Sequence, residues 1–197
     1  MTHATIDSVL QELTSMGSLS PEYFYKMIHR IPQAKVVERI PFILERVKDQ
    51  VVLDIGCDSP VSPAIRASAK GYFGIDKSPG DWWQMDLDVH PPPLEGSVTL
   101  IVCGEVLEHL SSPGFFLRNL RAFYPDRTVI FTVPNAFAAA SYRSVQRGIE
   151  CVNKDHVSYY SWWTLTNLLT RHGYRIEEWY WYNGAPLTAE GLVMVVR

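Results

Sequence analysis

The sequence predicts an α/β domain in which N-terminal helices precede a doubly wound, mostly parallel sheet of seven strands. Strand-like apolar runs alternate with helical segments from Val51 onward. The run Val98–Cys103 is unbroken and apolar, as expected for a central parallel strand covered on both faces. The last two strand-like runs follow each other directly, which favours an antiparallel hairpin at the end of the chain. A chain of 197 residues is long enough for one such domain with a full core.

The first 50 residues are expected to form a helical cap within the same domain as residues 51–197. Apolar residues recur at helical spacing over Ile6–Leu13, and Gly17 ends that helix. Ser20-Pro21 combines a capping residue with a proline suited to the first turn, so a second helix is predicted through about Arg30. Prolines at positions 32 and 41 interrupt the segment that follows, up to Lys48.

The core elements follow in order. The helices between the strands are expected to begin at Ser62-Pro63, at Ser112-Pro113 and at Ser161, because serine caps a helix and proline fits its first turn. Gly71 and Gly173 are expected to end the first and the last of these helices. The predicted strands are Val51–Ile55, Tyr72–Ile75, a short one near Trp83–Leu87, Val98–Cys103, Thr128–Val133, Tyr174–Tyr182 and Leu192–Val196.

Composition narrows the class of protein. A net charge of −3 gives no electrostatic case for a nucleic-acid polyanion as the main partner. The three cysteines are odd in number and widely spaced, which favours reduced thiols in a cytoplasmic protein. No signal peptide and no membrane-spanning run is recognisable, so no membrane partner is expected.

Two motifs indicate a nucleoside-containing cofactor. The segment Val51–Cys57 runs through Asp54 to Gly56, and a second apolar run ends at Asp76, 22 residues after Asp54. This span fits one strand–turn–helix–strand unit, whose second strand ends in an acidic side chain able to bind ribose hydroxyls. The pattern resembles class I S-adenosylmethionine (SAM) dependent methyltransferases of the type 11/type 23 subgroup. The resemblance implies that Asp54 and Gly56 hold the methionine part of SAM and that Asp76 binds the ribose diol.

The charge of the strand ends favours SAM over a dinucleotide. An acidic rim would repel a pyrophosphate, whereas SAM carries a sulfonium and an ammonium group and no phosphate. Two members of the rim, Asp58 and Asp81, have an equally good interpretation as ordinary loop residues. The full set is Asp54, Asp58, Asp76, Asp81 and Asp86.

The sequence Met85-Asp-Leu-Asp88 matches a third cofactor motif of the family. The resemblance implies that Asp86 accepts a hydrogen bond from the adenine amino group and that the N–H of Leu87 meets a ring nitrogen. Asp86 could also be a turn residue at the end of a strand. One departure from the family stands in the first loop, where Asp58 and Pro60 replace later glycines. Proline has no N–H to offer, so SAM binding would be weakened or the loop would take another path.

The segment Cys103–Pro113 carries a further family string, E-x-x-E-H-L. Glu105, Glu108 and His109 are spaced to share one polar face of a helix. In most of the resembled enzymes this face is a pocket wall, so we expect Glu105 to contact cofactor and reacting groups and His109 to contact the acceptor. In the ubiquinone-biosynthesis and small-RNA ribose methyltransferases the same string binds a divalent ion. A metal site of Glu105, Glu108, His109 and His156 is therefore an alternative, and it is not the favoured one.

The stretch between residues 134 and 160 is expected to line the acceptor pocket. The family resembled has V-P-N after strand five and a histidine with aromatic residues before the next helix, as here in "FTVPNAF" and "DHVSYYS". His156 is the candidate general base, because a hydroxyl acceptor loses its proton as the methyl group moves. Asn135, Arg143 and Tyr159 are the other candidate acceptor-binding residues.

The sequence thus predicts a cytoplasmic SAM-dependent methyltransferase that acts on a hydroxyl of a small molecule, as a monomer or a homodimer. A saccharide, a phenol or a secondary metabolite would suit as acceptor. Two rival functions stay open: a metal-dependent methyltransferase of the 3′-terminal ribose of RNA, and a catalytically silent binding or scaffold protein suggested by Asp58 and Pro60.

Overall fold

The computed structural model describes residues 5–17 and 28–197, which fall into two compact units, Met1–Pro32 and Gln33–Arg197. The first unit contains α1 (Ile6–Ser15), where the side chain of Thr5 caps the helix by accepting a hydrogen bond from the Ser8 N–H. This helix was predicted. The second predicted helix lies largely outside the described residues, and residues 28–30 are not helical. The expectation that residues 1–50 form one cap within a single domain stays a prediction.

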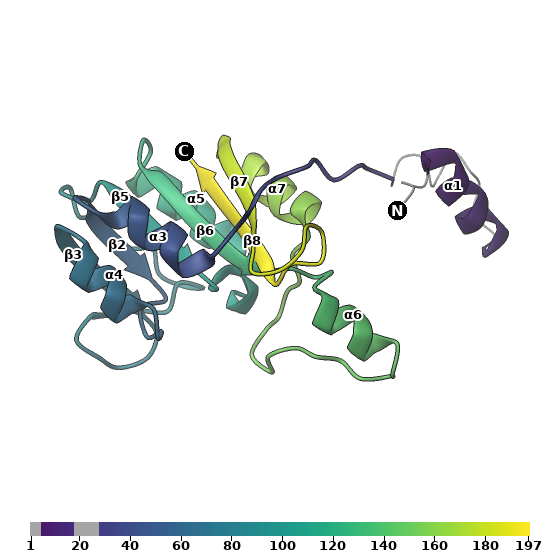
Figure 1. Ribbon diagram of the computed structural model, residues 1–197. Coiled ribbons are helices and arrows are strands. Elements are labelled where there is room, and N and C mark those ends of the chain that lie inside the picture. Colours follow the sequence, from purple (N-terminus) through teal and green to yellow (C-terminus); the bar gives the residue numbers. More distant parts are fainter. Residues whose placement is uncertain (1–4, 18–27) are drawn as a thin grey trace. The chain divides into compact units, whose positions relative to one another are not determined.

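The second unit is built on one eight-stranded sheet with the order β1-β7-β8-β6-β5-β2-β3-β4 (Figure 1). β8 pairs antiparallel with β6 and β7, as the closing hairpin required, and the other neighbours pair in parallel. The strands are β1 (Val36–Val37), β2 (Val51–Ile55), β3 (Gly71–Asp76), β4 (Trp83–Gln84), β5 (Leu100–Gly104), β6 (Thr128–Pro134), β7 (Ile176–Tyr182) and β8 (Gly191–Val196).

The α/β class and the doubly wound, mostly parallel sheet are confirmed, with one strand more than predicted. The extra strand is β1, whose Val36 and Val37 pair with Trp181 and Tyr182 at the end of β7. A strand of two residues is too short for an alternating pattern, so only its tertiary pairing reveals it.

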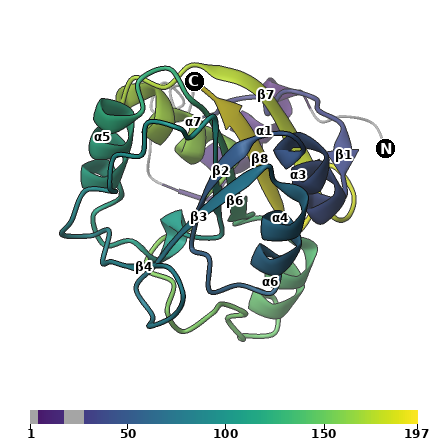
Figure 2. The same ribbon diagram turned by 90° about the vertical axis from the view of Figure 1, so that its left-hand side faces the viewer.

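Helices cover both faces of the sheet (Figures 1 and 2). α3 (Arg39–Val47) and α4 (Ser62–Ser68) lie on one face, where Ile43, Val47 and Ile65 pack into a core with residues of the central strands. α5 (Pro113–Phe123) and α7 (Trp162–Arg171) lie on the other. The start of α7 is as predicted, since Ser161 and Thr164 form a capping box. The start of α4 differs by one residue, with Val61 as the N-cap.

The direction of the strands determines where a ligand site can form. β2, β3, β5 and β6 are parallel, so their carboxyl ends meet at one edge of the sheet. The chain leaves these strands at Gly56, Asp76, Glu105 and Asn135. Open α/β sheets bind ligands at this edge.

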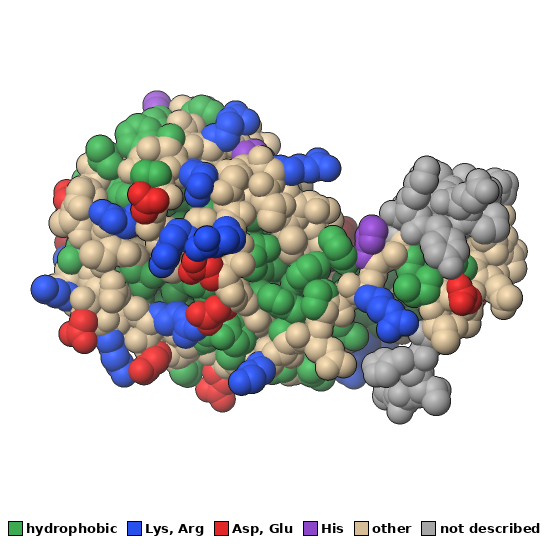
Figure 3. Space-filling view, turned by 90° about the horizontal axis from the view of Figure 1, so that it is seen from above, with side chains coloured by type: hydrophobic (Ala, Val, Ile, Leu, Met, Phe, Trp, Pro, Cys, Tyr) green, Lys and Arg blue, Asp and Glu red, His purple; other side chains and the backbone are tan. Residues whose placement is uncertain are grey.

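One helix lies apart from the layers of the fold, and the charges of the surface are mixed. α6 (Ala139–Val145) has no buried residue and lies beyond the carboxyl end of β6, away from the sheet faces (Figures 1 and 2). Basic and acidic side chains are interspersed on the face drawn in Figure 3, in keeping with the small net charge. Within residues 5–17 and 28–197, no helix has the length and the apolar character that crossing a membrane requires.

Candidate active site

A cavity of about 450 Å³ opens at the carboxyl edge of the sheet. Its volume is in the range of small-molecule sites. The loops after β2, β3, β4 and β5 line it, together with Arg39 and Ile43 of α3. The structure thus brings to one cavity all six residues that the sequence predicted to hold the cofactor: Asp54, Gly56, Asp76, Asp86, Leu87 and Glu105.

At the end of β2 the backbone lies close to neighbouring residues. Asp54 is buried and accepts a hydrogen bond of 2.9 Å from the hydroxyl of Tyr72. Burial raises the pKa of Asp54 to about 6. Gly56 has φ +81°, and a Cβ atom at this position would overlap the side chain of Val106. Only glycine therefore fits this turn without a shift of its neighbours.

The carboxylate of Asp76 is held in a fixed orientation. Oδ1 accepts hydrogen bonds from the N–H (2.9 Å) and the hydroxyl (2.8 Å) of Ser78. Oδ2 accepts one of 3.1 Å from the N–H of Asp58. Asp58 Oδ2 lies 2.7 Å from the same Ser78 hydroxyl, so the two carboxylates share its single proton. Asp58, which stands where the family has a glycine, therefore helps to orient Asp76, the residue predicted to bind the ribose.

The third cofactor motif lies on the same cavity. Leu87 is buried, and Asp86 is exposed with its Oδ1 accepting a hydrogen bond of 2.9 Å from the N–H of Asp88. This bond is typical of a carboxylate that stabilises its own turn. The turn role and the adenine role are compatible, because a carboxylate can accept several hydrogen bonds.

The helix predicted through Glu105, Glu108 and His109 is wrong. Only Leu107–His109 forms a single 3₁₀ turn, and Glu105 precedes it with φ +56°. Its N–H still pairs with the carbonyl of Thr132 on β6 at 2.9 Å, so Glu105 continues the β5–β6 pairing and is not part of a helix. As a result Glu105 and Glu108 do not share a face.

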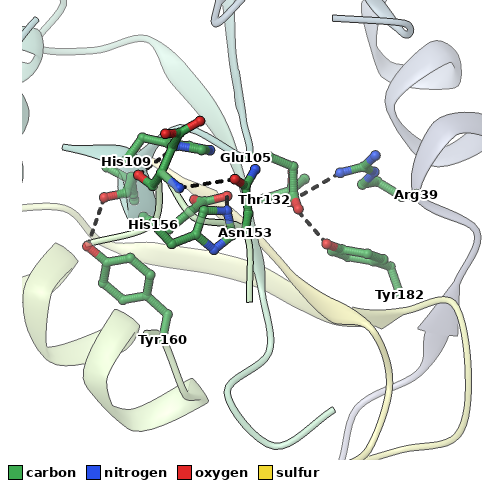
Figure 4. A network of polar contacts seen from close by, with 11 residues as sticks. Arg39, Glu105, His109, Thr132, Asn153, His156, Tyr160 and Tyr182 are labelled. Carbon is green, nitrogen blue, oxygen red and sulfur yellow. Dashed lines mark hydrogen bonds and ion pairs between the residues drawn. The ribbon is translucent and has the colours of Figure 1, made fainter. Parts of the chain in front are cut away.

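Glu105 belongs to a network of polar side chains from three distant segments (Figure 4). Its Oε1 accepts hydrogen bonds from Thr132 Oγ1 at 2.9 Å and from the hydroxyl of Tyr182 at 3.0 Å. The same oxygen lies 3.2 Å from Nη1 of Arg39. Arg39, Thr132 and Tyr182 were not among the predicted site residues, because no local motif connects these positions.

Glu108, His109 and His156 form a second group. Glu108 is 1% exposed, and in the described part of the chain neither of its carboxylate oxygens has a hydrogen-bond partner. His156 Nε2 lies 3.9 Å from Glu108 Oε1. The imidazole rings of His109 and His156 are arranged edge to face, with 4.6 Å between their centroids. Ligand atoms of the three residues lie within 4.8 Å of one another, and Glu105 is not among them. Of the four-residue metal set considered from the sequence, three members come together.

Burial and neighbouring charges shift the pKa values of this group. Burial and the negative charge of Glu105 raise the pKa of Glu108 to about 8. Burial and the neighbouring His109 lower the pKa of His156. At neutral pH the Glu108 side chain is therefore mostly protonated and the His156 imidazole neutral.

A smaller cavity of about 100 Å³ adjoins this group. Glu108, His156, Asn135 and Tyr159 contribute to its wall, so part of the 134–160 stretch lines a cavity. That this cavity receives the acceptor stays a prediction. Asn135 is buried, and its side-chain amide donates to backbone carbonyls at positions 187 and 189. Tyr159 donates to Glu150 at 2.6 Å. His109 lies on the larger cavity, and Arg143 is exposed on α6 and lines neither.

A family model described as a methyltransferase domain matches residues 25–178, most of the chain. The chain belongs to the type 23 methyltransferase family. It is a class I SAM-dependent methyltransferase with the Rossmann-like fold of that class, and its cofactor is SAM. No curated protein matches the sequence.

Solved methyltransferases share the fold at low identity. The small RNA methyltransferase HEN1 superposes with a TM-score of 0.66 at 14% identity, over 86% of this chain and 27% of that one. The present chain thus spans about a quarter of that relative. The methyltransferase domain of bacterial CtHen1-CN superposes with a TM-score of 0.60 at 17% identity, over 80% of this chain and 94% of that one. The N-methyltransferase NodS from Bradyrhizobium japonicum superposes with a TM-score of 0.58 at 17% identity, over 81% of this chain and 85% of that one. These likenesses concern the fold alone.

Proposed function

We propose that this methyltransferase transfers the methyl group of SAM to a hydroxyl group of a small acceptor, such as a saccharide, a phenol or a secondary metabolite. The observation that carries the proposal is the position of His156. Its ring lies against His109, which lines the larger cavity, and it forms part of the wall of the smaller one. A base at the junction of a cofactor cavity and an acceptor cavity suits proton removal from an acceptor.

The chemistry follows from the protonation state of His156. When bound, SAM supplies a methyl group made electrophilic by the sulfonium. The lowered pKa keeps the imidazole unprotonated at neutral pH, so it can accept the hydroxyl proton as the oxygen–carbon bond forms and the carbon–sulfur bond breaks. The products are the methyl ether, S-adenosylhomocysteine and a proton held by His156. The rest of the contribution of the protein is the positioning of the two reactants.

The size of the smaller cavity limits what reaches the base. A volume of about 100 Å³ holds only the reacting end of an acceptor. Asn135 and Tyr159 line this space. Their donors are taken by backbone carbonyls and by Glu150, so toward the acceptor each can offer only its oxygen as a hydrogen-bond acceptor. Arg143 would act only on a distal part of a larger acceptor, because it lies on exposed α6.

The test compares matched acceptors. The protein is incubated with methyl-labelled SAM and with pairs of compounds that differ only in a hydroxyl or an amine, such as phenols and the corresponding anilines. Labelled methyl ethers, identified by mass spectrometry, are the expected products. Labelling of the amines alone would show nitrogen methylation and contradict the proposal.

A second candidate function is favoured by the buried carboxylate of Glu108. An unpartnered carboxylate beside two imidazoles fits a divalent ion such as Mn²⁺, Zn²⁺ or Fe²⁺. Glu108, His109 and His156 would hold the ion, and Glu105 would not. A bound ion would assist by lowering the pKa of an acceptor hydroxyl. The acceptor in this case would be the 3′-terminal ribose of an RNA. HEN1, which shares the fold, is a small RNA methyltransferase.

A further inference from the structure

The loop after β2 has few free N–H groups to offer to an anion. The N–H groups of Gly56 and Cys57 both donate to the carbonyl of Ile75, at 2.9 and 3.1 Å. The N–H of Asp58 donates to Asp76, and Pro60 has none. The methionine part of SAM carries a carboxylate, which needs a cation or several N–H donors at its binding site. A cation on the cavity wall would therefore add to what this loop offers the carboxylate.

The larger cavity is mostly acidic. Its wall contains seven carboxylates and two cations, Arg39 and Lys77. Lys77 directly follows Asp76, so it lies at the predicted ribose end. Arg39 lies toward Gly56, at the predicted methionine end, because its partner Glu105 stands between Gly104 and Val106, the residues that a Cβ atom at Gly56 would meet first. The acidic side chains of the wall are Asp54, Asp58, Asp76, Asp86, Asp88, Glu105 and Asp155.

Arg39 has no evident role in its own helix. It is the first residue of α3, where a cation opposes the helix dipole. Its guanidinium instead points into the network of Figure 4 and stacks over the ring of Tyr182, with 5.2 Å from Cζ to the ring centroid. Its side chain is 24% exposed, so it is half-buried yet accessible from the cavity. A stacked guanidinium is pre-organised for a planar anion.

We propose that Arg39 binds the carboxylate of the methionine part of SAM and that Glu105 holds it in place for this contact. Guanidinium and carboxylate match as a fork with two parallel N–H···O bonds. Glu105 accepts from Thr132, Tyr182 and Arg39 on one oxygen, so its position does not depend on Arg39 alone. The arrangement supplements the backbone donors of the loop by a side chain at the start of α3, between β1 and β2.

The test compares three ligands by isothermal titration calorimetry. S-adenosylhomocysteine carries the carboxylate, its decarboxylated analogue lacks only that group, and 5′-methylthioadenosine lacks the whole amino-acid part. Arg39→Met should weaken binding of S-adenosylhomocysteine by about 10- to 100-fold, the range of a charged hydrogen bond. Binding of the other two ligands should change by less than about two-fold. Arg39→Lys should recover part of the loss, because it keeps the charge without the fork.

A matched control lies on the same helix. Arg46 pairs with Glu178 and stacks on Phe42, and it does not line the cavity. Arg46→Met should leave all three affinities unchanged. Equal weakening of all three ligands by Arg39→Met would mean that Arg39 only supports the shape of the cavity, and an unchanged affinity for S-adenosylhomocysteine would mean that it has no role. Either result overturns the proposal. The outcome is independent of the acceptor chemistry, because no acceptor is present.

Discussion

His156 Nε2 lies 3.9 Å from Oε1 of Glu108, and the carboxylate of Glu108 has no hydrogen-bond donor in the described residues. A buried carboxyl group without a donor is costly in its charged form, so it binds a proton or a cation. The imidazole beside it is neutral because burial and His109 lower its pKa. The pair can therefore act as a proton acceptor with a neutral neighbour or as two ligands of a metal ion, and the experiments below separate these roles.

Replacement of the base should abolish most of the turnover. His156→Ala should lower kcat by about 10²- to 10⁴-fold, the range for loss of a general base, and leave the affinity for S-adenosylhomocysteine nearly unchanged. Initial rates and calorimetry give the two quantities. His90→Ala serves as the control, because His90 is exposed and lines neither cavity. A kcat within a factor of three of the wild type would leave His156 with a structural role only.

The pH profile should carry the signature of a base with a lowered pKa. His156 must be unprotonated to act, so kcat/KM should fall as the pH drops through a value below the ordinary 6.5. Above that value the rate should reach a plateau near neutral pH. This acidic limb should be absent from the residual activity of His156→Ala. A limb centred well above 6.5 would contradict the base role.

Loss of Asp76 should weaken cofactor binding. The Asp76→Ala change removes a carboxylate held by Asp58 and Ser78, and it should reduce the affinity for S-adenosylhomocysteine by about 1.5–3 kcal/mol. Calorimetry measures the change, and circular dichroism checks the fold. Asp81→Ala is the control, since Asp81 is exposed and does not line the cavity. Wild-type protein that binds no S-adenosylhomocysteine at millimolar concentration would support the silent-scaffold alternative.

Metal dependence should distinguish the two candidate functions. If Glu108, His109 and His156 hold an ion, dialysis against a chelator should abolish activity and Mn²⁺ should restore it. Binding of Mn²⁺, followed by electron paramagnetic resonance, should be lost in Glu108→Gln and retained in Glu105→Gln, because Glu105 lies outside the cluster. Activity that survives chelation and no detectable Mn²⁺ binding would leave the metal-free mechanism. Labelling of RNA with a free 3′-terminal ribose would then also be absent.

The stability of the fold should depend on the charge of Glu108. Its folded-state pKa of about 8 lies above the ordinary value of 4.5, so the folded protein binds this proton more tightly than the unfolded chain. The contribution of this proton to stability is present below pH 4.5 and is lost as the pH rises to about 8. Glu108→Gln removes this dependence. The free energy of unfolding of the wild type, from urea titrations in chelator, should therefore fall relative to the variant between pH 5 and pH 8.

An ion at the cluster would reverse this pH effect. Mn²⁺ binds the ionised carboxylate, so it should stabilise the wild type at pH 8 and leave Glu108→Gln unchanged. A difference between the two proteins that is constant with pH would show that Glu108 is not held protonated by its surroundings.

The sequence by itself determined the layers of the fold and the cofactor edge of the sheet. Hydrophobic runs such as Val51–Ile55 and Val98–Cys103 are local patterns, and parallel strands bring their carboxyl ends together whatever the details of packing. The positions of Asp54, Gly56 and Asp76 on one cavity follow from this topology. The capping residue Ser161 likewise acts within a few residues of the helix that it begins.

Tertiary structure decided which side chains of the site meet. The spacing of Glu105 and Glu108 suits a helix, but the Glu105 N–H pairs with Thr132 on β6 and the residue has φ +56°, so Glu105 lies outside the cluster of Glu108, His109 and His156. Arg39 reached the cavity from the start of α3, between β1 and β2, where the sequence has no motif. Contacts between distant segments depend on how helices and strands pack, so local spacing does not encode them. The two-residue strand β1 exists for the same reason, because β7 supplies its hydrogen-bond partners.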